Sequence, residues 1–68
     1  MKIILAGSYQ EYREALIEFG LTEKEAIYGH SIERMAGIEA DEVIITGKFY
    51  GLKNDRELKD FADNRIRK

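Results

Sequence analysis

The sequence predicts a small α/β domain built on a three-stranded parallel sheet. Three short apolar runs, each ending at a glycine, alternate with segments of helical periodicity; the runs span residues 3–7, 26–29 and 43–47. Parallel neighbours need a crossover connection, which is usually a helix, so this β-α-β-α-β-α order indicates parallel strands. Right-handed crossovers favour the strand order 2-1-3, as in half of a Rossmann-like or flavodoxin-like fold.

The first two elements are a strand over residues 2–6 and the helix that follows it. The strand is apolar without alternation, as expected when both faces of a parallel sheet are covered. Ser8 and Glu11 match a capping box at the start of the helix, and Gly20 marks its end. Helical spacing places four apolar side chains against the sheet: Tyr12, Ala15, Leu16 and Phe19.

The second strand is expected over residues 26–28. Another capping-box match at residues 22–25 leaves room for only one turn before it. After the strand, Ser31 is expected to cap a short helix over residues 32–36, which Gly37 ends.

The third strand is expected over residues 42–46, where β-branched residues follow one another. A loop over residues 47–51 comes next. Asn54 and Glu57 then match a capping box at the start of the last helix.

The length and composition of the chain limit the classes of function that it can have. The chain has 68 residues, and we expect a single domain over residues 1–68. It has no cysteine and one histidine, so neither a disulfide nor a thiolate or multi-histidine metal site can form within one chain. We therefore expect no metal and no cofactor. The formal net charge is −2, which argues against nucleic acid as a partner, because nucleic-acid binders usually carry a basic surplus.

The apolar run at residues 3–6 is too short for a signal-peptide core or a membrane span, so we expect a soluble, cytoplasmic protein. In the order 2-1-3, the second and third strands form the edges of the sheet. Exposed strand edges are usually blunted or paired. We therefore expect a homodimer, formed through an edge strand or an uncovered face of the sheet.

The ends of the three strands supply the candidate ligand-binding residues, which are Gly7, Ser8, Gly29, His30, Gly47 and Lys48. In a parallel sheet these ends share one edge, where the ligands of open α/β sheets bind. A glycine before a helix lets backbone N–H groups approach a phosphate, and Lys48 is suited to meet an anion. The same residues also have structural interpretations, because Ser8 caps its helix and a lone histidine in a turn is more often a hydrogen-bonded structural residue.

Phe49 and Tyr50 are candidate partner-binding residues. They lie in the loop after the third strand, and paired aromatic side chains at a loop tip are typical interface anchors. In the alternative interpretation, these aromatics fold back over the core.

Several short segments together resemble small, largely uncharacterised bacteriophage proteins with a minimal Rossmann-like pattern. These segments cover most of the chain: residues 4–8 (Ile-Leu-Ala-Gly-Ser), 20–22 (Gly-Leu-Thr), 26–28 (Ala-Ile-Tyr), 34–37 (Arg-Met-Ala-Gly), and Gly47 with Phe49 and Tyr50. The resemblance implies a phage or prophage accessory protein, which would act in the cytoplasm of the host cell. It implies no known activity.

Two functions follow as hypotheses. The first is a non-catalytic phage-type accessory protein that binds a host or phage protein, as a homodimer. The second is a nucleotide or phosphometabolite binder that uses the glycine-bearing edge of the sheet. The sequence offers no catalytic constellation, so an enzyme that uses His30 as an acid or base ranks last, and we expect that the protein is not an enzyme.

Overall fold

Three parallel strands form the sheet in a computed structural model that describes residues 1–66. They are β1 (Lys2–Leu5), β2 (Ala26–Tyr28) and β3 (Glu42–Ile45), in the spatial order β2-β1-β3. In the centre of the sheet, Ile3 of β1 pairs with Ile27 of β2 on one side and with Val43 of β3 on the other. The predicted α/β class and strand order are therefore confirmed, and the arrangement is consistent with a minimal Rossmann-like fold.

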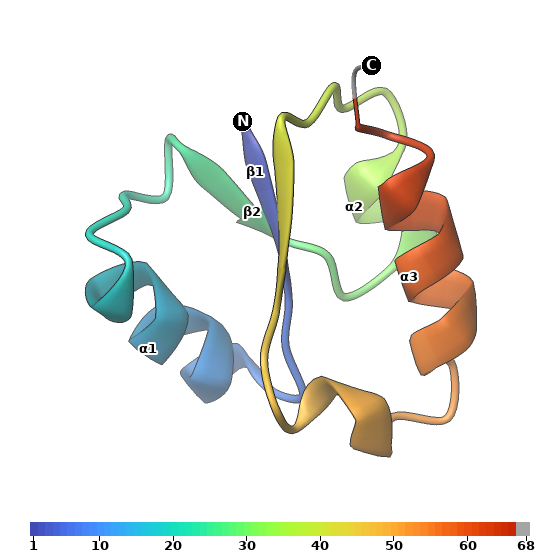
Figure 1. Cartoon of the computed structure of the whole chain (residues 1–68), viewed down its shortest axis with the longest axis horizontal. Helices are drawn as coiled ribbons and strands as arrows, with labels where there is room; N and C mark the ends of the chain where they lie inside the picture. Colours follow the sequence, from blue (N-terminus) through green and yellow to red (C-terminus); the bar gives the residue numbers. More distant parts are fainter. Residues whose placement is uncertain (67–68) are drawn as a thin grey trace.

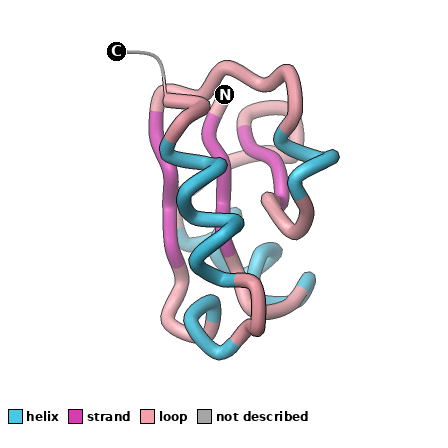
Figure 2. The backbone as a smooth tube through the Cα atoms, turned by 90° about the vertical axis from the view of Figure 1, so that its right-hand side faces the viewer, coloured by secondary structure: helices cyan, strands magenta, loops and turns pink. Residues whose placement is uncertain are grey.

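The helices cover the two faces of the sheet unequally (Figure 1). Helix α1 (Tyr9–Glu18) lies alone on one face, whereas α2 (Ile32–Met35) and α3 (Asp55–Asp63) lie on the other. A short 3-10 helix, η1 (Phe49–Gly51), joins β3 to α3. Figure 2 shows α3 crossing in front of the strands on that second face.

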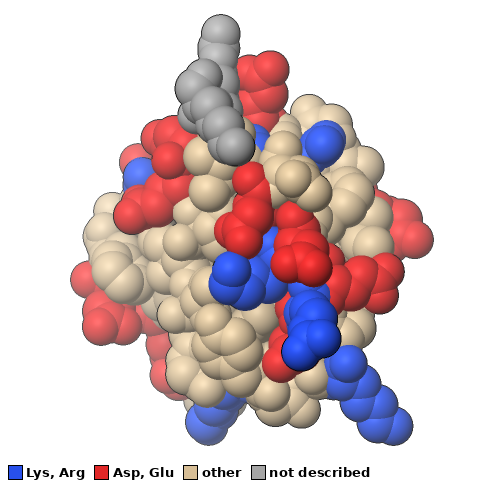
Figure 3. Space-filling view, turned by 45° about the vertical axis from the view of Figure 1, so that its right-hand side comes forward, with Lys and Arg blue, Asp and Glu red and all other residues tan. Residues whose placement is uncertain are grey.

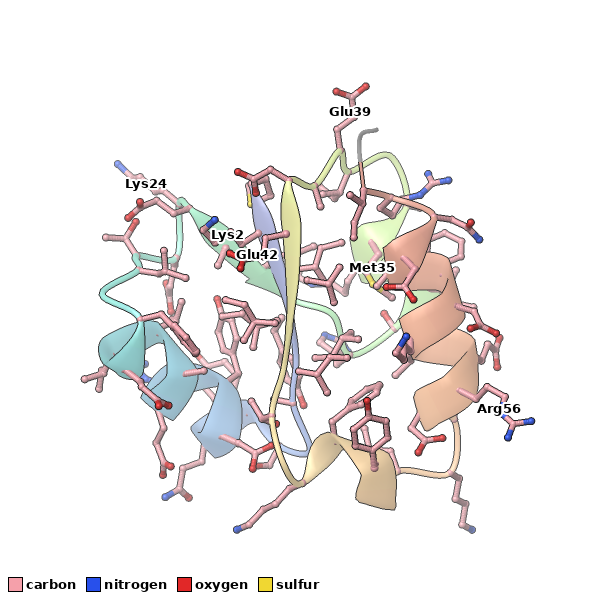
Figure 4. All side chains as sticks on the ribbon, viewed as in Figure 1. Lys2, Lys24, Met35, Glu39, Glu42 and Arg56 are labelled. Atoms are coloured by element: carbon pink, nitrogen blue, oxygen red, sulfur yellow. The ribbon has the colours of Figure 1, made fainter. Side chains whose placement is uncertain are left out.

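The face under α2 and α3 holds the larger closed core. Its buried side chains are Ile3, Leu5, Met35, Ala40, Phe49, Leu58 and Ala62. Figure 4 shows Met35 pointing into the space between the sheet and α3. Because residues alternate between the two faces of a strand, Ile3 and Leu5 enter this core while Ile4 enters the other.

The face under α1 holds a second, smaller core. Its buried side chains are Ile4, Ala6, Tyr12, Ala15, Leu16 and Ala26. Leu21, Tyr28 and Ile44 pack against its margins and are only half-buried. One helix therefore covers the middle of the sheet on this face and leaves the side chains of both edge strands partly open.

Two of the three predicted helix caps have the expected geometry. The hydroxyl of Ser8 accepts a hydrogen bond from the backbone N–H of Glu11 at 3.2 Å, and Ser31 caps α2 in the same way. Asn54 occupies the N-cap position of α3, but its side chain makes no capping bond. That prediction was wrong: Asp55 instead accepts the hydrogen bond of a first-turn backbone N–H, from Arg56 at 2.6 Å.

The expectation that both loop aromatics are exposed is also wrong for one of them. Phe49 is 0% exposed and lies in the core beneath α3, whereas Tyr50 remains 58% exposed. Both residues lie in η1, and the exposed ring of Tyr50 packs edge-on against the buried ring of Phe49, with 5.5 Å between the centroids. Phe49 is therefore a packing residue, and only Tyr50 presents an aromatic ring to solvent here.

Across residues 1–66, the helices are too short and too polar for any of them to cross a membrane.

Candidate functional site

The ends of β1 and β3 meet closely at the carboxyl edge of the sheet. A Cβ atom on Gly7 would lie 2.7 Å from the backbone carbonyl oxygen of Lys48 and 2.8 Å from its Cβ. Such distances are shorter than any normal contact, so glycine is required at this position. The predicted juxtaposition of Gly7 and Lys48 is confirmed, and their backbones are already packed together.

A carboxylate of the chain itself occupies the crevice between these two strand ends. Oε1 of Glu11 accepts a hydrogen bond from the backbone N–H of Gly7 at 2.8 Å, and the hydroxyl of Thr46 donates to the same oxygen. The Gly7 bond, the Thr46 bond and the backbone of Lys48 together hold the pKa of Glu11 below its ordinary value. The place where a phosphate is expected to bind is therefore filled by an internal anion.

Sequence reasoning missed this role of Glu11. In a capping box the acidic side chain bonds back to the N–H of the cap residue, but here it reaches one residue further, to Gly7. Thr46 contributes the hydroxyl and Lys48 the backbone, and both lie just after the end of β3, far from Glu11 in the sequence. Nothing in the local motif identifies those partners.

Gly29 is closely packed against core side chains. A Cβ there would lie 2.9 Å from the side chains of both Ile3 and Leu5, and 3.0 Å from the sulfur of Met35. The glycine is buried and lets β2 approach the core under α2. Gly47, by contrast, has open space around it, so its surroundings differ from those of Gly7 and Gly29.

His30 lies apart from Gly7 and Lys48, in a groove on the β2 side of α1. We call this the aromatic groove; it is lined by Tyr9, Tyr12, Glu23, Tyr28, His30 and Arg34 and encloses about 310 Å³. The rings of Tyr12 and Tyr28 stack with centroids 5.2 Å apart and 15° between their planes. The exposed imidazole of His30 meets Tyr28 edge-on at 4.8 Å.

Two contacts fix the floor of the aromatic groove. The hydroxyl of Tyr12 donates to the carbonyl of Ala26 at 3.4 Å, which ties α1 to β2. Burial raises the pKa of both Tyr12 and Tyr28, so both phenols are neutral at physiological pH. Tyr9 forms an outer wall; it is 53% exposed, and its ring centroid is 5.8 Å from that of Tyr12.

A second groove runs along the other side of α1, beside β3. We call it the acidic groove; it is lined by Glu11, Glu14, Ala15, Glu18, Phe19 and residues 44–47 and encloses about 350 Å³. Glu14 and Glu18 are exposed on its rim, one helical turn apart. Phe19, predicted to face the sheet, is instead 53% exposed, because it follows the last residue of α1.

Of the further hollows on the α3 side of the molecule, one of about 260 Å³ lies between residues 38–39 and 64–66, and two others lie along α3. The larger, of about 630 Å³, spreads between Ile32 of α2 and Phe61 of α3, and charged side chains of both signs surround it. Figure 3 shows this mixture of Lys and Arg with Asp and Glu on the face that it draws. The smaller, of about 230 Å³, lies beside Tyr50, Arg56 and Lys59; Arg56 points away from the body of the protein (Figure 4). Neither hollow gathers side chains of one chemical kind.

Residues 1–66 contain no group of three or more His, Cys, Asp or Glu side chains arranged to hold a metal ion.

Comparison with known proteins gives no match: no family model, no curated protein and no solved structure resembles this chain closely enough to be identified.

Proposed function

We propose that the protein is a small, non-catalytic binding protein that takes up an extended segment of a protein partner along β3. The observation that carries this proposal is the open edge of β3 beside the acidic groove. A role as a phage-type accessory protein in the host cytoplasm is part of the same proposal. It rests on the resemblance described above.

The edge of β3 is suited to accept another strand. The order β2-β1-β3 leaves β3 with a neighbour on one side, and within residues 1–66 no strand pairs along its other side. A free edge presents a row of backbone N–H and C=O groups that an extended peptide can join. Just before β3, Ala40 already pairs in parallel with Ile66 and donates to the carbonyl of Arg65 at 2.8 Å. Extended backbone therefore docks at the segment that leads into this strand.

The acidic groove indicates the chemistry of the partner. Glu14 and Glu18 would face the side chains of a segment added to β3, and Phe19 supplies an exposed apolar surface at the end of the groove. Alternate residues of a strand point to opposite faces. The best-fitting partner is therefore an extended segment with Lys or Arg on the α1 face, next to apolar positions.

A homodimer is also part of this proposal, and we expect it to form through a surface other than the edge of β3. Two copies of β3 paired about a two-fold axis would bring Glu14 and Glu18 of one protomer toward the same residues of its partner. Facing like charges are destabilising, so the acidic groove disfavours this symmetric arrangement. Analytical ultracentrifugation at high protein concentration tests the dimer, and a clean monomer would remove it.

The experiment for the main proposal is a binding titration with a short extended peptide of alternating Lys and Val. We expect this peptide to bind. A control peptide that differs only by a proline at its centre should not bind, because proline has no backbone N–H to donate to the hydrogen-bond ladder along β3. Reversing both rim charges (Glu14→Lys with Glu18→Lys) should weaken binding about tenfold.

The matched control is the double variant Glu57→Lys with Asp60→Lys, which changes the net charge equally on exposed positions of α3. It should bind the peptide almost as tightly as the unmodified protein. Equal losses in the two double variants would show that net charge alone attracts the peptide, and would contradict a site at β3.

A phosphorylated ligand at the glycine crevice is the second candidate. The observation that favours it is the set of donors around Glu11, since the N–H of Gly7 and the hydroxyl of Thr46 already hold an anion there. A phosphate would have to displace that carboxylate. Inorganic phosphate should then raise the melting temperature, and Lys48→Glu should abolish the effect. An unchanged melting temperature up to millimolar phosphate would contradict this candidate.

A further inference from the structure

We propose that the aromatic groove binds the base of a mononucleotide. This site lies on the opposite side of α1 from β3 and is independent of the proposed peptide site. Its distinguishing feature is that three of the four tyrosines of the chain, together with its only histidine, gather in one cavity. Tyrosine rings offer large, rigid faces on which a planar ring can stack.

The arrangement of the rings selects a planar ligand. Tyr12 and Tyr28 are nearly parallel, whereas Tyr9 is inclined by 40° to Tyr12 and by 49° to Tyr28. A cage for a quaternary ammonium group would surround its ligand with ring faces, and Arg34 on the wall would repel such a cation. A neutral heterocycle has no such conflict and can stack against the exposed ring of Tyr9.

The polar side chains of the groove match the other parts of a nucleotide. Arg34 can pair with a phosphate in the bidentate geometry that guanidinium favours. Glu23 can accept a hydrogen bond from an exocyclic amino group, and the imidazole of His30 offers further hydrogen-bonding nitrogens. All three side chains are exposed at the rim, so they are accessible to a ligand from solvent. A mononucleotide whose base carries an exocyclic amino group, as adenine does, therefore matches the side chains of the groove.

Proton NMR provides a direct test, because the single imidazole of His30 gives isolated C–H signals. The probes are AMP, adenosine, which lacks the phosphate, and ribose 5-phosphate, which lacks the base. We expect AMP to shift the His30 signals saturably, adenosine to do so more weakly, and ribose 5-phosphate to leave them unchanged. No shift at millimolar AMP would overturn the proposal.

Three variants locate the site. Tyr9→Ala removes the exposed stacking surface and should weaken AMP binding about tenfold or more. Tyr50→Ala, which removes the fourth tyrosine outside the groove, should leave AMP binding unchanged. Arg34→Ala should weaken the binding of AMP but not of adenosine. AMP binding that survives Tyr9→Ala, or that Tyr50→Ala abolishes, would overturn the proposal. Because Tyr9 does not line the acidic groove, Tyr9→Ala should also leave peptide binding intact, which separates this test from that of the proposed function.

Discussion

The two faces of the sheet differ in how completely helices cover them. Under α2 and α3, Phe49, Leu58 and Met35 are completely buried and close the core. Under α1, one helix covers the middle of a three-stranded sheet, and a groove remains open on each of its sides. The closed face therefore contributes more fully buried apolar side chains to stability, whereas the half-open face leaves surface accessible to a ligand.

The two sides of α1 also differ, in the chemistry of the grooves that lie beside them. On the β3 side, Glu14 and Glu18 form an acidic rim beside an open strand edge. On the β2 side, stacked tyrosines form a nearly neutral aromatic surface. A single helix therefore presents two chemically distinct grooves, and substitutions can test each without disturbing the other.

The largest effect is expected on the closed face, from Phe49→Ala. Removing a fully buried aromatic ring costs about 3–5 kcal/mol, which is enough to unfold most molecules of a domain this small. Tyr50→Ala, at the adjacent exposed position, should change stability by no more than about 0.5 kcal/mol. Urea denaturation of both variants measures the difference. Similar losses in the two would contradict the assignment of Phe49 to the core.

The next largest difference in stability is expected between alanine substitutions at two of the strand-end glycines, Gly29 and Gly47. Gly29→Ala forces a methyl group against Ile3, Leu5 and Met35 and should cost about 1–3 kcal/mol. Gly47→Ala places its methyl group in open space, so it should be neutral, or should stabilise by up to about 1 kcal/mol by restricting the unfolded chain. Thermal denaturation distinguishes the two. A destabilising Gly47→Ala would show that the end of β3 is more tightly packed than the structure indicates.

A smaller, pH-dependent effect is expected from the Glu11 carboxylate. Its folded-state pKa is lowered from the ordinary value of 4.5, chiefly by the N–H of Gly7. The ionised form therefore stabilises the fold above about pH 4.5, and this contribution disappears as the pH falls through the lowered folded-state pKa. Glu11→Gln should be less stable at pH 7, and the difference from the unmodified protein should shrink at low pH. A difference that stays constant between pH 7 and pH 3 would contradict the role of this carboxylate.

The smallest effect on stability is expected in the aromatic groove. Tyr9 is half exposed, so Tyr9→Ala should change the free energy of unfolding by at most about 0.5 kcal/mol. Tyr12→Phe should cost about 1 kcal/mol, because it removes the hydrogen bond to the carbonyl of Ala26. Urea denaturation measures both. A Tyr9→Ala loss larger than that of Tyr12→Phe would show that Tyr9 is part of the core, rather than a surface available to a ligand.

The sequence predicted the framework of the fold well, because the framework depends on local patterns. The three strands begin at the predicted residues, and two of them end one residue earlier than expected. Ser8 and Ser31 cap their helices as predicted. The strand order followed from the handedness of crossovers, which does not require knowledge of any side-chain contact.

The candidate site was predicted only in part, because it depends on contacts between distant segments. Gly7 and Lys48 do meet, but the role of Glu11 requires the Thr46 hydroxyl and the Lys48 backbone, which no helix-capping pattern reveals. Phe49 turns inward because η1 forms where a loop was expected. The aromatic groove had a signal in the sequence: Tyr9 and Tyr12 lie one helical turn apart, and Tyr28 lies in the strand next to that helix.

The most direct test of the account is an NMR titration of the amide signals with the basic extended peptide. We expect shifts along residues 42–47 and from Glu14 of α1 to Phe19 just after that helix, with little change in α3. Such a pattern would place binding on the half-open face and at the edge of β3. Shifts centred on α3 or Tyr50, or no shifts at millimolar peptide, would contradict the central claim that the open side of the sheet is the binding surface.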